Sequence, residues 1–227
     1  RQIRIGRSDR STPRRMRRRN RERKALPPEL QDKTGRVVLV YGESLPLGDP
    51  NSGSASPQAA LPRAANPRQI VQWCAIRPDT DDTFERFVAE PACPLRTGPL
   101  ECMELDPSHM EHALTQAEFE REWTSFCRPG DIYIAWNQST LDLLATLTPP
   151  AAARHLLKAI YSNLGRPHRG KVEAIADAEN VARPAQSFAG RANRRIEATL
   201  GLLECVRTAG GTSGESDQGA PRNRAPG

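Results

Sequence analysis

The sequence predicts a mixed α/β fold, in which one β-sheet is flanked by α-helices. Two observations carry this prediction. Short runs rich in β-branched, aromatic and apolar residues occupy 36–41, 68–78, 83–91 and 131–136, as is typical of strands. Segments with apolar residues at helical spacing follow, between residues 115 and 206. A single sheet with helices on its faces is the economical way to bury these patterns.

The first three strands are expected to form a meander. The stretch RVVLVYGESLPLG, residues 36–48, is a short buried strand that ends before one carboxylate, Glu43, and a Pro/Gly turn. Segments 68–78 and 83–91 alternate apolar and polar residues and are joined by PDTDD, which predicts a hairpin. The intervening residues, about 48–67, are rich in Pro, Ser, Ala and Gly and predict a poorly ordered insertion.

Helices and one further strand complete the domain. Residues 115–127 predict a helix with Thr115 as N-cap and Glu118 completing a capping box. DIYIAW, residues 131–136, is short and apolar enough to be a fully buried fourth strand. A helix capped by Ser139 or Thr140 is expected next, and the last three helices are predicted at 151–164, 170–182 and 190–206.

The charge is concentrated at the N-terminus. The net charge of the chain is +6, but residues 1–24 contain twelve Lys and Arg residues and two acids, so the rest of the chain is slightly acidic. A block of this kind stays extended and can neutralise phosphates, which predicts contact with RNA or DNA; a solvated linker or a localisation tag is the alternative. The residues expected to bind nucleic acid are Arg14, Arg15, Arg17, Arg18, Arg19, Arg21, Arg23 and Lys24.

These features divide the chain into an Arg-rich arm or linker (1–34), a folded domain (35–207) and a disordered tail (208–227). Because the chain begins with Arg1 rather than Met, we expect it to be part of a longer protein, with an upstream domain as a partner. The absence of a long apolar run and of a signal-peptide pattern predicts a cytoplasmic protein that does not contact membranes.

Other candidate sites are weaker. The cysteines show no metal-ligand spacing and are expected to be reduced thiols: Cys74, Cys93, Cys102, Cys127 and Cys205. His109 and His112 are three residues apart, but a surface or capping role is favoured over metal binding. A second basic cluster, Arg166 to Lys171 with His168 inside it, is interpreted as a polar loop or a phosphate contact.

Four stretches suggest a family: RVVLVYGESLPLG, RQIVQWCAIRP with TFERFVAEP, DIYIAWNQSTLDLL and GRANRRIEATLGLL. Together they resemble the RNase H-like fold of the DEDD-type 3′–5′ exonucleases, such as the proofreading and RNase T groups, over residues 36–206. The resemblance implies four carboxylates that hold two divalent metal ions, with a His or Tyr as general base.

The family's catalytic pattern is only half present. The first Asp falls on Tyr41, while its companion Glu is kept as Glu43 and the second-motif Asp as Asp142. The third-motif His falls on Gly190 and its Asp on Arg195. Two carboxylates cannot neutralise two Mg²⁺ ions, and the resemblance places Arg195 where it would pair with Glu43 and Asp142 instead.

The resemblance therefore implies a catalytically degenerate exonuclease-like domain without cofactor or metal, acting as a nucleic-acid-binding or auxiliary module of a larger RNA- or DNA-processing protein. One alternative is an active 3′–5′ exonuclease in which Glu43 and Asp142 hold Mg²⁺ or Mn²⁺, with Glu197 or Asp177 as a further ligand. Another alternative is that the chain is the C-terminal extension of a DTW-type tRNA-uridine aminocarboxypropyltransferase. Only the order of an Arg-rich arm and a degenerate nuclease-like domain suggests this, and no motif does.

Overall fold

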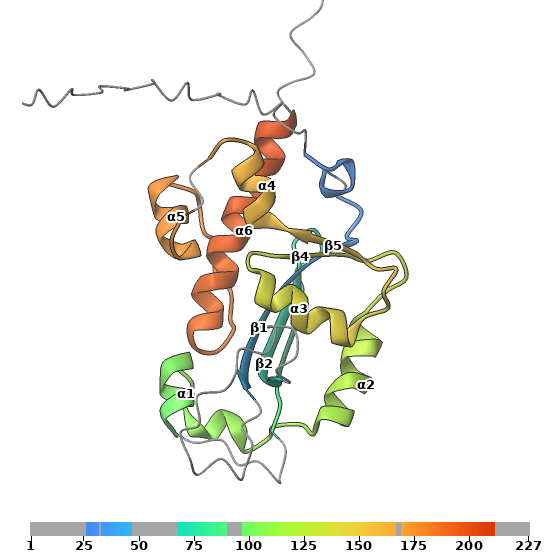
Figure 1. The fold of residues 1–227 in the computed structure, drawn as a ribbon, viewed down its shortest axis with the longest axis vertical. Helices are drawn as coiled ribbons and strands as arrows, with labels where there is room; N and C mark the ends of the chain where they lie inside the picture. The colour runs from blue at the N-terminus through green and yellow to red at the C-terminus, as the bar shows by residue number, and fades with distance from the viewer. Residues whose placement is uncertain (1–25, 32, 47–67, 90–96, 167–168, 212–227) are drawn as a thin grey trace, which may run out of the picture.

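A five-stranded mixed sheet forms the centre of the computed structural model, which describes residues 26–31, 33–46, 68–89, 97–166 and 169–211 (Figure 1). The strand order is β3-β2-β1-β4-β5. The first three strands form the antiparallel meander, and β4 and β5 lie parallel to β1. The strands are β1 (Val37–Pro46), β2 (Arg68–Arg77), β3 (Asp82–Phe87), β4 (Ile132–Ala135) and β5 (Ala153–Leu156). This arrangement confirms the predicted mixed α/β class and the meander.

Helices cover both faces of the sheet (Figure 1). They are α1 (Thr97–Met103), α2 (Gln116–Phe126), α3 (Gln138–Leu147), α4 (Leu157–Asn163), α5 (Val172–Ala178) and α6 (Gly190–Gly211), with 3-10 turns η1 (Pro28–Leu30) and η3 (Pro107–Met110). Residues of α2 and α3 share one core cluster with Val38 and Val40. Residues of α4, α5 and α6 share another with Leu39 and Tyr41. Because side chains alternate along a strand, β1 sends Tyr41 and Glu43 toward α6 and Gly42 toward α3.

Several local predictions are confirmed. The β2–β3 hairpin turns through Pro78–Asp81, and all four residues of β4 are buried. The hydroxyl of Thr115 accepts a hydrogen bond from the Glu118 amide, and the Glu118 carboxylate accepts one from the Thr115 amide, so the capping box is present.

Other local predictions need correction. Glu43 lies inside β1, paired with Gln72, because β2 continues to pair with β1 beyond it. The N-cap of α3 is Asn137, whose side chain accepts from the Thr140 amide. The predicted helix at 151–164 is divided, since its first part pairs with β4 as β5 before α4 begins at Leu157. The helix α1 has no counterpart among the predicted elements.

The domain extends beyond its expected bounds at both ends. Leu26 and Leu30, from the segment assigned to the arm, are buried in the core, and the Leu30 carbonyl accepts a hydrogen bond from Arg207. Helix α6 continues to Gly211, past residue 207. The basic residues Arg14 to Lys24, the insertion at 48–67 and the tail from 212 lie outside the described residues.

Two further expectations concern cysteines and membranes. The four cysteines within the described ranges are free thiols, and Cys93 lies outside those ranges. None of the helices found in the described part of the chain has the length and apolarity needed to cross a membrane.

Candidate functional site

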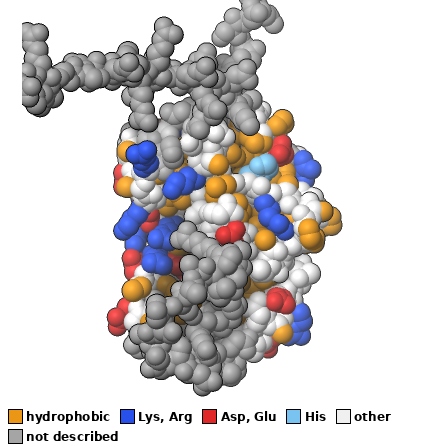
Figure 2. All heavy atoms as spheres, viewed as in Figure 1, with side chains coloured by type: hydrophobic (Ala, Val, Ile, Leu, Met, Phe, Trp, Pro, Cys, Tyr) orange, Lys and Arg blue, Asp and Glu red, His pale blue; other side chains and the backbone are white. Residues whose placement is uncertain are grey.

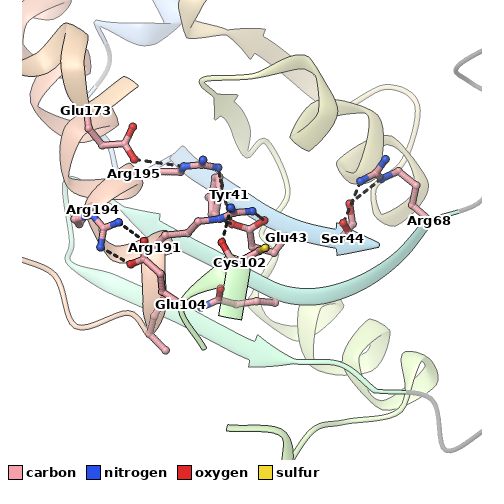
Figure 3. A network of polar contacts seen from close by, with 12 residues as sticks. Tyr41, Glu43, Ser44, Arg68, Cys102, Glu104, Glu173, Arg191, Arg194 and Arg195 are labelled. Carbon is pink, nitrogen blue, oxygen red and sulfur yellow. Dashed lines mark hydrogen bonds and ion pairs between the residues drawn. The ribbon is translucent and has the colours of Figure 1, made fainter. Parts of the chain in front are cut away.

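Two buried residues of β1 and two half-buried residues of α6 meet in one cluster (Figure 3). The Glu43 carboxylate is 5% exposed and accepts hydrogen bonds from Arg191 through both oxygens, with Nη2 at 2.6 Å from Oε2. The Tyr41 hydroxyl donates to Glu43 and accepts from Arg195. The Arg195 guanidinium lies 3.9 Å from the same carboxylate. We call Tyr41, Glu43, Arg191 and Arg195 the ion-paired cluster.

The periodicities of the two elements explain why these residues meet. Tyr41 and Glu43 are two apart on a strand and therefore share one face of the sheet. Arg191 and Arg195 are four apart on a helix and share one face of α6. Because α6 packs on that face of β1, two guanidinium groups converge on one carboxylate. A planar guanidinium matches a carboxylate in a bidentate geometry, as Arg191 does here.

The electrostatics of the cluster keep its hydrogen bonds in place. Burial, followed by the charge of Glu43, holds the pKa of Tyr41 above its ordinary value, so the hydroxyl remains a donor at neutral pH. The hydrogen bonds from Arg191 to Glu43 raise the pKa of Arg191, which stays charged. At neutral pH the single carboxylate of the cluster thus faces two cations.

Further polar contacts around the ion-paired cluster hold α6 in place against α1, the loop after α1, and α5. Arg194 forms a bidentate pair with Glu104 at 2.5 and 2.6 Å, and Arg191 also donates to the Cys102 carbonyl at 2.7 Å. Arg195 lies 3.4 Å from Glu173 of α5. These contacts tie the start of α6 to α1, to the loop after it and to α5, and so hold Arg191 and Arg195 over β1.

Gly190 is a point of close backbone approach. Its φ of +61° lies in the left-handed region, and a Cβ placed there would lie 2.6 Å from the Met103 carbonyl oxygen. A side chain at this position would have to displace the backbone between α1 and η3. The position where the resemblance places the general base therefore has no room for one.

Asp142 is not part of the ion-paired cluster. It is exposed on α3, where it accepts a hydrogen bond from Gln138 at 2.8 Å, and this is its one polar side-chain contact among the described residues. Leu143, its neighbour, packs beside Gly42 on the opposite face of β1 from Glu43. Arg195 was expected to pair with both Glu43 and Asp142. It lies at ion-pair distance from Glu43, at 3.9 Å, but has no contact with Asp142, and Arg191 makes the shorter contacts with Glu43.

The alternative acidic ligands also have other partners. Glu197 accepts from the Gln186 amide and from Asn193, and Asp177 pairs with Arg183. His109 caps η3 by accepting from the Asp106 amide, as the capping interpretation expected. Across the described ranges there is no group of three or more His, Cys, Asp or Glu side chains placed to hold a metal ion.

The residues at this site do not fit two divalent metal ions. A pair of Mg²⁺ or Mn²⁺ ions needs several oxygen ligands for each ion, most of them carboxylates. Here Glu43 is already neutralised by Arg191, and a second positive side chain, Arg195, stands beside it. A cation placed next to these two guanidinium groups would be repelled by them.

Comparison with known proteins identifies the fold. No protein-family model matches the sequence, and no curated protein shows significant sequence similarity to it. The structure is similar to that of Exonuclease X in complex with duplex DNA carrying a 5′ overhang, with 12% identity, a TM-score of 0.50, and coverage of 79% of this chain and 94% of that one. This chain has the RNase H-like exonuclease fold.

Two further structures support the exonuclease fold. A 3′-exonuclease that recognises the 3′ end of a histone mRNA stem-loop is 12% identical with a TM-score of 0.52, and the match covers 76% of this chain and 63% of that one. Cell-death related nuclease 4 (CRN-4) is 12% identical with a TM-score of 0.50, covering 77% and 64%. This chain therefore spans less than two thirds of the length of these last two proteins.

Arg191, which donates two hydrogen bonds to Glu43, was not among the predicted site residues. The available signal was its spacing, because two arginines four apart on a helix present both charges on one side. Only Arg195 fell on a motif position, so Arg191 received no role. The structure brings together Tyr41, Glu43 and Arg195, leaves Asp142 apart, and places Gly190 at the start of the same helix.

Proposed function

We propose that this chain is an exonuclease-fold domain without nuclease activity that serves as a nucleic-acid-binding or auxiliary module of a larger RNA- or DNA-processing protein. The observation that carries the proposal is the bidentate Arg191–Glu43 pair, with Arg195 beside it. A guanidinium supplies the positive charge that would otherwise come from a metal ion, but it cannot activate water.

The binding part of the proposal rests on two observations. Among the proteins with similar structures, one is shown with duplex DNA and another recognises an mRNA stem-loop. The sequence of this chain carries its positive charge in the arm, where eleven residues from Arg14 to Lys24 include eight Lys and Arg. Such a block gains affinity for phosphates by releasing counterions.

A nuclease assay tests the catalytic part. We expect no degradation of single-stranded RNA or DNA by the full chain in Mg²⁺ or Mn²⁺, and no heat of Mn²⁺ binding in calorimetry. The active-exonuclease alternative predicts the opposite: degradation that depends on the metal and disappears in the Asp142→Ala variant. That result would refute the proposal.

Salt-dependent binding tests the role of the arm. The full chain should bind RNA or DNA with an affinity that falls steeply as salt rises, and removal of residues 1–24 should abolish most of the binding. A variant that keeps the length of the arm but carries Gln at the eight basic positions shows whether binding depends on the charge of the arm or on its length. Equal affinity of the shortened chain at low salt would contradict this role.

A further inference from the structure

A small pocket of about 190 Å³ opens beside the ion-paired cluster. It lies where α4, α5 and α6 meet the end of β4, and its charged lining groups are Lys158, Lys171, Arg195 and Glu173. Tyr41 and Trp136 supply an aromatic wall. Figure 2 shows Lys and Arg side chains gathered on the left of the visible face, over α5 and α6. The pocket is thus lined by three cations and one carboxylate.

Two of these positive groups have no hydrogen-bond or ion-pair partner among the described residues. Among the described residues, the amines of Lys158 and Lys171 make no hydrogen bond or ion pair, although both residues line the pocket. Arg195 already bonds Tyr41 and faces Glu173. Lys158 lies in α4 and Lys171 is the N-cap residue of α5, so the fold brings residues from two separate segments to this pocket. Three positive groups and one carboxylate give the pocket an excess of positive charge, which would attract an anion.

Polar atoms beside the lysines indicate what else the ligand carries. One carboxylate oxygen of Glu173, Oε2, is buried and has no hydrogen-bond partner. A hydroxyl or amine on the ligand would satisfy it, because an ionised carboxylate only accepts hydrogen bonds. The Asn137 side chain, which caps α3 through its oxygen, also lines the pocket and has its amide group available as a donor. The pocket therefore offers lysine amines that attract an anion and a carboxylate oxygen that accepts a hydrogen bond from a donor on the same ligand.

A phosphate monoester fits this combination. It carries a charge of about −1.5 to −2 near neutral pH and three strong acceptor oxygens, more than a phosphodiester offers. Lysine ammonium groups bind phosphate as point charges. A divalent cation would instead meet three positive side chains. A sugar hydroxyl next to the phosphate would reach the unpaired oxygen of Glu173.

We propose that this pocket binds a phosphate monoester directly through Lys158 and Lys171, without a metal ion. The inference rests on the proposed function, in which the metal site has been replaced by the ion-paired cluster. The phosphate belongs either to the end of a nucleic-acid strand or to a free nucleotide, which share this chemistry. The pocket would then recognise a phosphorylated end while the arm holds the rest of the strand.

Matched oligonucleotides test the proposal in a chelating buffer with the full chain. One RNA sequence is used with a 3′-phosphate, with a 5′-phosphate or with hydroxyl groups at both ends, together with a nucleoside monophosphate as competitor. We expect one terminal phosphate to tighten binding at least about tenfold, the value for one charge-assisted hydrogen bond. The double variant Lys158→Gln, Lys171→Gln should lose this preference and bind the hydroxyl-ended strand as the parent chain does.

The control variant is Arg121→Gln, which removes one positive charge from an exposed residue of α2, on the other face of the sheet. It should keep the phosphate preference. Equal unfolding midpoints of all three chains show that the substitutions leave the fold intact, which is the expected result for lysines at the surface of a pocket.

The outcomes separate this inference from the proposed function. Strand binding without any preference for a terminal phosphate, or a preference that survives in the double lysine variant, overturns the pocket and leaves nucleic-acid binding in place. Binding of the nucleoside monophosphate that depends on both lysines, without binding of any strand, supports the pocket as a nucleotide site and refutes nucleic-acid binding. Binding of neither refutes both.

Discussion

At the residue scale, Glu43 shows how a buried carboxylate can be stabilised by arginine side chains and a tyrosine hydroxyl instead of by solvent. A buried ionised carboxylate is costly unless it is paired and hydrogen-bonded. Arg191 supplies two hydrogen bonds, Tyr41 a third, and Arg195 a second positive charge. The same negative charge that would attract a cation is thereby used to fasten α6 to β1.

Glu43→Gln should destabilise the domain by about 2 kcal/mol, between the values for buried and exposed pairs, because Arg191 would lose its charged partner. The matched control is Glu104→Gln. Both carboxylates form bidentate pairs with arginines of α6, but the Glu43 side chain is 6% exposed and that of Glu104 is 46% exposed. The control should lower the free energy of unfolding in urea by clearly less than Glu43→Gln does, because solvent screens an exposed pair. Equal losses would mean that burial does not decide the strength of these pairs.

At the element scale, the start of α6 is set by a glycine rather than by a cap residue. Gly190, the first residue of α6, adopts a left-handed conformation close to the backbone at the end of α1, which places Arg191 within reach of Glu43. The same glycine therefore leaves no room for a side chain and positions the arginine that pairs with Glu43.

Gly190→Ala should destabilise the domain by about 2 kcal/mol or more, because the left-handed conformation and the contact with the Met103 carbonyl both oppose a Cβ. Gly98→Ala provides the control. A Cβ at Gly98, in α1, would meet no atom within 4 Å, so this change should leave stability equal or raise it by up to about 1 kcal/mol. Thermal unfolding of both variants measures the difference. A harmless Gly190→Ala would contradict the close approach.

A second buried pair joins β2 to the start of β4. Arg77 is fully buried, donates to both oxygens of Asp131 at 2.6 and 2.9 Å, and also donates to the carbonyls of Gly35 and Phe126. These four bonds fasten the end of one strand to the beginning of another. They leave the guanidinium no contact with solvent.

Arg77→Met should cost about 3–5 kcal/mol, the range for removing one partner of a buried ion pair. Arg128→Met is the control, since Arg128 pairs with Asp82 at 2.7 Å but its side chain is 56% exposed. That change should cost no more than about 1 kcal/mol. Urea denaturation at neutral pH compares the two. If Arg77→Met lowered the free energy of unfolding by less than Arg128→Met does, the charge of Asp131 would be stabilised without Arg77.

At the scale of the whole molecule, the tyrosines report on the integrity of the core. The chain has three, Tyr41, Tyr133 and Tyr161, and all three are buried with raised pKa values. Desolvation is the main cause for each, and it raises the pKa of Tyr161 to about 12. Their environments differ, since Tyr41 belongs to the ion-paired cluster and Tyr161 packs against Trp136.

These shifts predict a pH dependence with a definite sign. Because the folded pKa values exceed the unfolded value of 10.0, the tyrosines contribute stability that is fully present below pH 10 and is lost as the pH rises through the folded values. Ultraviolet titration should therefore show little phenolate between pH 10 and the onset of unfolding, and full ionisation in denaturant. A folded chain that ionises a tyrosine near its ordinary pKa would contradict the burial.

The fold class, the meander, the buried fourth strand and the capping of α2 could all be predicted from the amino-acid sequence, because they follow from short-range periodicity and turn chemistry. The sequence also placed Tyr41, Glu43 and Arg195 at one site through the resemblance to exonucleases. It did not determine how far β1 extends or that 153–156 becomes a strand, since both depend on pairing with other strands. The pairing of Arg191 with Glu43, 148 residues away, and the position of Lys158 and Lys171 in one pocket became evident only from the folded structure. Contacts between residues so far apart are fixed by the packing of whole elements, which leaves no local pattern in the sequence.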